Sequence, residues 1–148
     1  MKNEIQKVLY TAKTHTIGGR DGKAISSDGK LDIKLTPPGI KSEGTNPEQM
    51  FAAGWSACFL GALGLAAKKS EVMLPSDTSI DAEVDLGTTV DGFQLEARLK
   101  INMPGLDKDL AKQLAEMAHQ TCPYSKAVKS NINVTIEVGV EILKLQNS

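Results

Sequence analysis

The sequence predicts an α+β protein in which an antiparallel β-sheet packs against a long, buried central helix. Three observations predict this fold: an apolar stretch of helical length over residues 47–67, a hairpin pattern around Asp91-Gly92, and an amphipathic segment over residues 106–120. The chain has 148 residues, of which 41% are hydrophobic and 4% aromatic, so a single core built from aliphatic side chains is expected. We therefore expect residues 1–148 to form one domain.

The first third of the chain has the pattern of strands. Residues 7–16 are rich in Val, Tyr and Thr with partial alternation, and residues 23–35 place Asp28-Gly29 between two short alternating runs, which predicts a hairpin. Gly18 to Gly22 form a flexible turn between these segments. Residues 36–47 are a Pro- and Gly-rich loop, and loops of that length are often functional.

The start of the long helix is marked by its first residues. Asn46 suits the cap, Pro47 the first helical position and Glu48 the positive end of the helix dipole. Apolar residues then occur on every face, so we expect a helix that is buried all round. The stretch approaches the length of a membrane span, but its glycines and the strand patterns on both sides favour a core helix.

The second half of the chain alternates strand and helix patterns. Residues 79–90 and 93–103 alternate in polarity on either side of the Asp91-Gly92 turn. The amphipathic helix that follows stops before Pro123, because the residue before a proline is pushed out of the helical region, and a short helix restarts there. Residues 131–145 are expected to form one final strand.

Composition and charge exclude several classes of function. The net charge is −1 and no basic block exists, which argues against binding to nucleic acid or to acidic membranes. The N-terminus has no apolar secretory segment, so we expect a cytoplasmic protein. Two cysteines without a CxxC motif and two histidines provide poor metal-ligand spacing, so no metal site is expected.

The two cysteines are the candidate reactive groups. Cys58 lies in the middle of the apolar helix, where a free cysteine most often packs as a small hydrophobe. Cys122 precedes Pro123 at a helix start, where the dipole and free amides favour a thiolate. Only the fold can bring two residues so far apart in sequence together. If it does, one sulfur can attack and the other can resolve, as in a redox thiol site; if not, both are packing residues.

A thiolate within an apolar helix needs a positive partner, since burial alone raises its pKa. Arg20, between glycines, is the candidate, although a solvated turn arginine has the same pattern. Glu48 suits a bidentate contact with a guanidinium and equally suits a first-turn acid at the helix dipole. His119, three residues before Cys122, leaves a Cys–His hydrolase open, and a metal site at these two residues lacks further ligands.

Three motifs carry a family resemblance over nearly the whole chain. "GTNPEQMFAAGWSACF", "HQTCPYSKAVKSNINVTIEV" and, upstream, "GGRDG" resemble the organic hydroperoxide resistance proteins, a branch of the osmotically inducible protein C family. Trp55 stands where the family pattern has tyrosine. The resemblance implies a cysteine-based thiol peroxidase that reduces organic hydroperoxides to alcohols and serves the oxidative stress response.

The resemblance also implies roles for individual residues. Cys58 matches the peroxide-attacking cysteine and Cys122 the resolving cysteine, which closes a redox-active disulfide. Arg20 matches the arginine that stabilises the thiolate, and Glu48 the acid that orients it. The family works as an intertwined homodimer, with a dihydrolipoyl group on a partner protein as its usual reductant and without metal or flavin.

Two expectations concern the substrate and the dimer. An apolar pocket that gains from burying an alkyl chain would be lined by residues of the long helix: Met50, Phe51, Trp55 and Phe59. On one straight helix Glu48 and Cys58, ten residues apart, lie roughly 15 Å apart, so we expect Glu48 of one chain to serve Cys58 of the other.

Two other classes of function stay open at this point. One is a binding module that holds a fatty acyl ligand with inert cysteines, and the other is a redox sensor whose disulfide is the signal. Turnover of an organic hydroperoxide with a dithiol reductant separates the enzyme from both.

Overall fold

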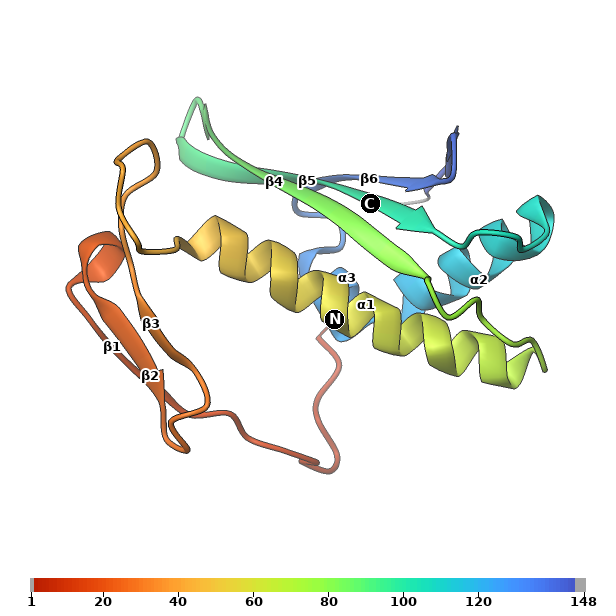
Figure 1. The fold of residues 1–148 in the computed structure, drawn as a ribbon, viewed down its shortest axis with the longest axis horizontal. Helices are drawn as coiled ribbons and strands as arrows, with labels where there is room; N and C mark the ends of the chain where they lie inside the picture. The colour runs from red at the N-terminus through yellow and green to blue at the C-terminus, as the bar shows by residue number, and fades with distance from the viewer. Residues whose placement is uncertain (1, 146–148) are drawn as a thin grey trace. The chain divides into compact units, whose positions relative to one another are not determined.

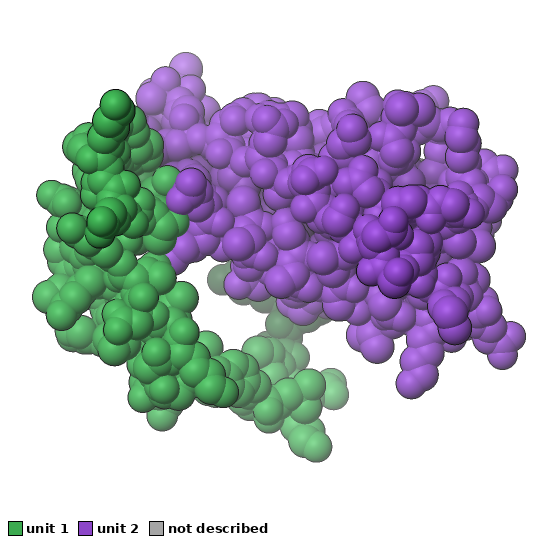
Figure 2. Space-filling model, viewed as in Figure 1, with its two compact units in different colours: residues 1–47 green, residues 48–148 purple. Residues whose placement is uncertain are grey.

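The computed structural model describes residues 2–145 and divides into two compact units, residues 1–47 and residues 48–148 (Figure 2). Both helices and strands are present, and the α+β class is confirmed. That the whole chain acts as a single domain stays a prediction, and its residues 1 and 146–148 lie outside the described part.

The first unit is built on a small antiparallel sheet. Strands β1 (Thr14–Ile17), β2 (Lys23–Ser26) and β3 (Asp32–Lys34) pair in chain order, and the hairpin at Asp28-Gly29 is confirmed. The predicted first strand over residues 7–16 was too long at its N-terminal end, since β1 begins at Thr14. The glycine-rich turn contains one 3-10 turn, η1 (Gly19–Asp21), which follows Gly18 at φ 77°.

The second unit packs helices on one side of a four-stranded sheet (Figure 1). Its helices are α1 (Pro47–Lys69), α2 (Lys108–Thr121) and α3 (Pro123–Val128). Its strands are β4 (Ser79–Thr89), β5 (Gly92–Asn102), β6 (Asn133–Val138) and β7 (Glu141–Ile142), adjacent in that order. The hairpin of β4 and β5 pairs over its full length, with Thr89 opposite Gly92 at the turn, as predicted.

The sheet differs from the predicted one in two ways. It is mixed, because β6 pairs parallel to β5, and the helices α2 and α3 provide the crossover that a parallel pair requires. The single strand expected over residues 131–145 is two strands. Gly139 has φ 62°, which glycine adopts without strain, and it turns the chain back so that β7 pairs antiparallel with β6.

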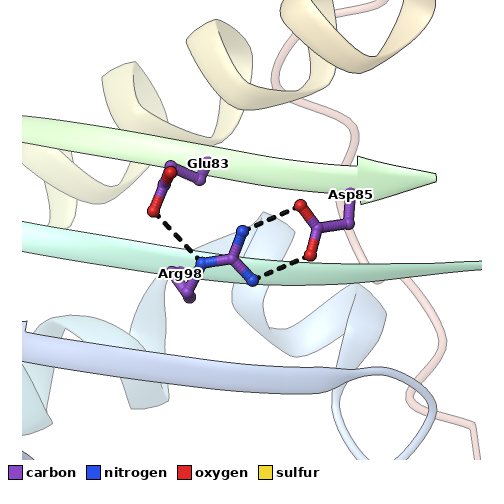
Figure 3. Close-up of polar contacts among 3 residues, drawn as sticks. All are labelled: Glu83, Asp85 and Arg98. Carbon is purple, nitrogen blue, oxygen red and sulfur yellow. Dashed lines mark hydrogen bonds and ion pairs between the residues drawn. The ribbon is translucent and has the colours of Figure 1, made fainter. Parts of the chain in front are cut away.

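The core of the second unit lies between the sheet and its helices. Its largest fully buried side chains come from both the helices and the sheet. They are Trp55, Phe59 and Leu63 on α1, Leu114 on α2, Leu99 and Ile101 on β5, and Ile136 on β6. The opposite face of the sheet is polar. There Arg98 on β5 forms two 2.8 Å hydrogen bonds to the Asp85 carboxylate and one of 3.1 Å to Glu83, both on β4 (Figure 3).

α1 is buried on one face only, so the expectation of burial all round was wrong for the single chain. Trp55, Phe59 and Leu63 are fully buried, whereas Leu65 is 71% exposed. By length and composition α1 could cross a membrane, but a helix packed into a core in this way is what soluble proteins also contain.

Candidate active site

Cys58 lies near the middle of α1, on the face that also carries Phe51 and Trp55. These residues are separated by four and three positions, so they lie above one another on one side of the helix. Trp55 is fully buried and Cys58 is half-buried. The Cys58 sulfur therefore lies where the buried face of α1 meets its more open side.

Cys122 occupies the break between α2 and α3. Its backbone is extended (φ −60°, ψ 121°), because Pro123 disfavours the helical conformation in the residue before it. Its N–H donates to the carbonyl of Ala118 at 2.8 Å, and its carbonyl accepts from the N–H of Lys126 at 2.9 Å. Cys122 thus ends one helix and caps the next, as the sequence predicted for the start of α3.

The fold brings the two thiols into contact. The Sγ atoms of Cys122 and Cys58 lie 3.5 Å apart, within hydrogen-bonding distance for sulfur, although the residues are 64 positions apart in sequence. Both cysteines are reduced, and Cys122 is fully buried. A disulfide has an S–S bond of about 2.05 Å, so bonding needs the sulfurs to approach by only about 1.5 Å. The condition for a redox thiol pair is met.

The surroundings of Cys58 act on its protonation in both directions. Burial raises the pKa of the Cys58 thiol, and the hydrogen bond and proximity of Cys122 raise it further. The backbone N–H of Tyr124 opposes this by donating to the Cys58 sulfur, which lowers the pKa. The net effect raises the pKa of Cys58 and favours its neutral form, so a thiolate at Cys58 requires additional stabilisation by a positive group.

Aromatic side chains lie on the same helices as the two cysteines. The Phe51 ring meets Trp55 edge to face at a centroid distance of 5.4 Å and lies 6.2 Å from the ring of Tyr124 on α3. Phe59 is fully buried and lies 6.4 Å from the ring of His119. Of the predicted substrate-binding residues, Met50 and Phe51 are half-buried, while Trp55 and Phe59 belong to the core.

Arg20 and Glu48, the other two predicted catalytic residues, lie on different elements. Arg20 is exposed on η1 in the first unit, and Glu48 is half-buried in the first turn of α1. Since α1 is continuous from Pro47 to Lys69, Glu48 and Cys58 lie roughly 15 Å apart along its axis, as the sequence argument assumed. The roles assigned to Arg20 and Glu48 stay predictions.

His119 lies in the last turn of α2 and is partly buried. Burial lowers the pKa of its imidazole, and the charge of Lys129 lowers it further, so the ring is neutral at pH 7. Its ring contact is with Phe59. Within residues 2–145 no three His, Cys, Asp or Glu side chains are grouped as metal ligands.

Sequence reasoning missed two residues of the site, Tyr124 and Ser125. The Tyr124 N–H reaches the Cys58 sulfur, and the Ser125 hydroxyl accepts a 3.0 Å hydrogen bond from the Trp55 indole. Both follow Cys122 directly within "TCPYS". The available signal was helical spacing, because Ser125 lies three residues after Cys122 and Trp55 three residues before Cys58.

Comparison with known proteins decides the family. Residues 40–137 match the family model described as OsmC-like protein. The chain belongs to the OsmC-like family. It is 47% identical over 138 residues to the organic hydroperoxide resistance protein of Xanthomonas axonopodis pv. citri, covering 90% of this chain and 97% of the relative. It is 42% identical to OhrB of Bacillus subtilis over 88% of this chain and 98% of that protein.

Solved structures agree with the family assignment. The crystal structure of Bacillus subtilis OhrB superposes with a TM-score of 0.84 at 40% identity, over 88% of this chain and 99% of that chain. A Vibrio cholerae structure described as a putative organic hydroperoxide resistance protein, with captopril bound in one of its active sites, gives a TM-score of 0.89 at 34% identity. That match covers 96% of this OsmC-like chain and 100% of the other. The resemblance drawn from the cysteine motifs is confirmed.

Proposed function

We propose that this OsmC-like protein is a thiol peroxidase that reduces organic hydroperoxides to alcohols. The observation that carries the proposal is the 3.5 Å contact between the Cys58 and Cys122 sulfurs. It occurs in a chain whose relatives at 42% and 47% identity are named organic hydroperoxide resistance proteins. Reduction of one hydroperoxide requires two electrons, and two thiols at that distance can supply both by forming one disulfide.

The first step uses Cys58 as the nucleophile. Its thiolate attacks the outer oxygen of the hydroperoxide and breaks the O–O bond; the alkoxide takes a proton and leaves as the alcohol, and Cys58 becomes a sulfenic acid. Because its surroundings raise the pKa of Cys58, a cation must stabilise the thiolate, and we assign this to Arg20, oriented by Glu48. The Tyr124 N–H contributes one further donor to the sulfur.

The second step uses Cys122 as the resolving thiol. Its sulfur attacks the Cys58 sulfenic acid, the S–S bond forms, and hydroxide leaves with a proton as water. An external dithiol then reduces the disulfide by thiol–disulfide exchange, and we assign this role to a dihydrolipoyl group carried by a partner protein. The cycle needs no metal and no further cofactor, and it suits a cytoplasmic enzyme of oxidative stress defence.

Preference for organic over hydrogen peroxide follows from the apolar residues around Cys58. Burial of an alkyl chain against them contributes about 0.8 kcal/mol per methylene, which hydrogen peroxide cannot gain. Met50 and Phe51, which are half-buried, are the direct contacts we assign. Trp55 and Phe59, predicted as further contacts, are fully buried and would shape the pocket from behind.

A second copy of the chain would cover the open face of α1, giving the proposed homodimer. Small and apolar residues recur every four positions along that face and are exposed: Ala53, Ala57, Gly61 and Leu65. Such a face permits close approach of two helices. If the two α1 helices run antiparallel, Glu48 of one copy comes near Cys58 of the other, and the active site is composite.

Steady-state turnover of cumene hydroperoxide tests this function, with dihydrolipoyl, thioredoxin and glutathione donors compared side by side. We expect the dihydrolipoyl donor to support turnover, Cys58→Ser to abolish it, and Cys122→Ser to allow one oxidation before stalling or over-oxidation. Thr121→Ser, an exposed neighbour of Cys122 that keeps its hydroxyl, is the matched control. Full activity in Cys58→Ser would refute the proposal.

A further inference from the structure

The hydrogen bond between Trp55 and Ser125 joins the same two helices as the thiol pair. Trp55 and Cys58 lie on α1, and Ser125 follows Cys122 on α3. We propose that Trp55 and Ser125 are positioning residues that hold the Cys122 sulfur within reach of Cys58 and so decide how fast the disulfide closes. The inference rests on the proposed peroxidase function and adds a role for the Trp55–Ser125 hydrogen bond, which that function does not use.

The geometry is that of two parallel links between two helices. Trp55 precedes Cys58 by three residues and bonds Ser125, which follows Cys122 by three residues. Three residues of helix rise by about 4.5 Å, so the indole–hydroxyl link lies one turn away from the sulfur–sulfur contact. Two links at that spacing fix both the separation of α1 and α3 and their rotation about each other.

Burial makes the Trp55–Ser125 link specific. Trp55 is 0% and Ser125 2% exposed, so water cannot replace either partner of the 3.0 Å bond. The indole N–H can only donate, and loss of the hydroxyl would leave it buried and unsatisfied. The Trp55 ring is held in place by the edge-to-face contact of Phe51, which also faces Tyr124.

The link matters for chemistry because the Cys58 sulfenic acid has two competing fates. Attack by the Cys122 thiol forms the disulfide and releases water. Attack by the sulfenate on a second hydroperoxide breaks another O–O bond, gives a sulfinic acid and releases a second alcohol. Only the first reaction depends on the distance between the two sulfurs. Loosening α3 should therefore raise over-oxidation without an equal effect on the first attack.

The experiment compares Ser125→Ala and Trp55→Phe with the wild type. Intact mass after a series of hydroperoxide equivalents measures the sulfinic acid formed per turnover, and stopped-flow loss of thiol measures the first attack. Loss of one buried hydrogen bond corresponds to roughly a tenfold change in a competing rate. We expect each variant to raise over-oxidation per turnover about tenfold, while the first attack in Ser125→Ala changes by less than about threefold.

Controls separate positioning from general damage. Ser56→Ala removes a hydroxyl on α1 whose hydrogen bond goes to Ala52 within the same helix, and it should match the wild type. The double variant Trp55→Phe/Ser125→Ala should be no worse than either single variant, because both remove the same link. Wild-type over-oxidation in both single variants, or additive effects in the double variant, would overturn the inference.

A measurement on the unmodified protein covers the case in which the variants do not fold. Trp55 is the single tryptophan of the chain, so its emission reports on this link directly. After a hydroperoxide pulse, we expect the Trp55 emission to change at the same rate as the disulfide closes. Unchanged emission overturns the inference. Failure of the proposed function looks different, since the wild type would then not consume hydroperoxide at all.

Discussion

Gly61→Ala tests whether a second copy of the chain covers the open face of α1. An added Cβ at Gly61 meets no atom within 4 Å in the single chain. Replacing a glycine by alanine inside a helix stabilises it by about 1 kcal/mol. For a chain of this size that gain corresponds to a rise in Tm of about 2–4 °C, provided that nothing else packs against this face.

The homodimer reverses the sign of that effect. If two α1 helices meet at their small residues, the new methyl groups force them apart at a cost of about 1–3 kcal/mol each. A two-fold axis makes the cost act twice in the dimer, whereas the gain in helix stability is present in monomer and dimer alike and does not offset it. We therefore expect the dissociation constant of the dimer to rise at least about 30-fold, which corresponds to about 2 kcal/mol.

Sedimentation velocity over a range of protein concentrations measures this change, together with Tm at the same concentrations, since a dimer has a concentration-dependent Tm. Gly87→Ala is the matched control, because Gly87 lies on β4 and a Cβ there also meets nothing within 4 Å. A Gly61→Ala protein that sediments like the wild type and melts 2–4 °C higher at every concentration would show that no second helix lies on this face.

Three further predictions follow from burial and charge. Leu99→Ala empties a fully buried position and should cost about 2–5 kcal/mol in urea unfolding, whereas Leu86→Ala, at a side chain 43% exposed, should cost far less; equal costs would contradict the core assignment. The pKa of His119 in the folded protein lies below its ordinary value of 6.5, so its contribution to stability is full above pH 6.5 and is lost as pH falls through the folded pKa. In His119→Gln, the free energy of unfolding in urea should therefore depend less on pH over that window. The Arg98 guanidinium holds the pKa of the Asp85 carboxyl below its ordinary 3.8, so Arg98→Gln should move the carbon-detected NMR titration of Asp85 upward, and an unchanged titration would show that the contact does not persist in solution.

The elements that the sequence predicted well are those set by local chemistry. The Asp91-Gly92 turn fixes the register of the long hairpin because glycine accepts a backbone that other residues resist, and Gly92 has φ 138°. Pro47 begins α1, and Pro123 ends α2 and begins α3, because proline restricts both its own backbone and that of the residue before it. These signals act within a few residues, so one sequence is enough to detect them.

The elements that the sequence did not predict depend on distant partners. The parallel pairing of β6 with β5 leaves no mark on the alternation of either strand, since both pairing modes use the same period. The exposed face of α1 is composed of the same kinds of residue as a buried face. Which of the two it becomes depends on which other elements pack against it. The turn at Gly139 was not predicted, because the alternating apolar pattern continues on both sides of it.

The candidate site divides in the same way. Spacing could not place Cys58 beside Cys122, and only the motifs that carried the family resemblance favoured a pairing of the two; the structure brings their sulfurs to 3.5 Å. The link between Trp55 and Ser125 was equally out of reach, because a tryptophan in an apolar helix and a serine in a short motif each have an ordinary explanation alone. The contact becomes visible only when α1 and α3 are seen together.

The protonation of the thiol pair connects the fold to its chemistry. Each sulfur is a poor nucleophile while neutral, and burial together with Cys122 favours the neutral form of Cys58. A neutral thiol at position 58 attacks a hydroperoxide slowly. On the function proposed above, a cation activates the Cys58 sulfur, and the residue assigned to that role, Arg20, belongs to residues 1–47, whereas both thiols belong to residues 48–148. If Arg20 has the role proposed for it, the nucleophile and its activating charge come from different segments of the chain, and the reactivity of Cys58 then depends on both segments.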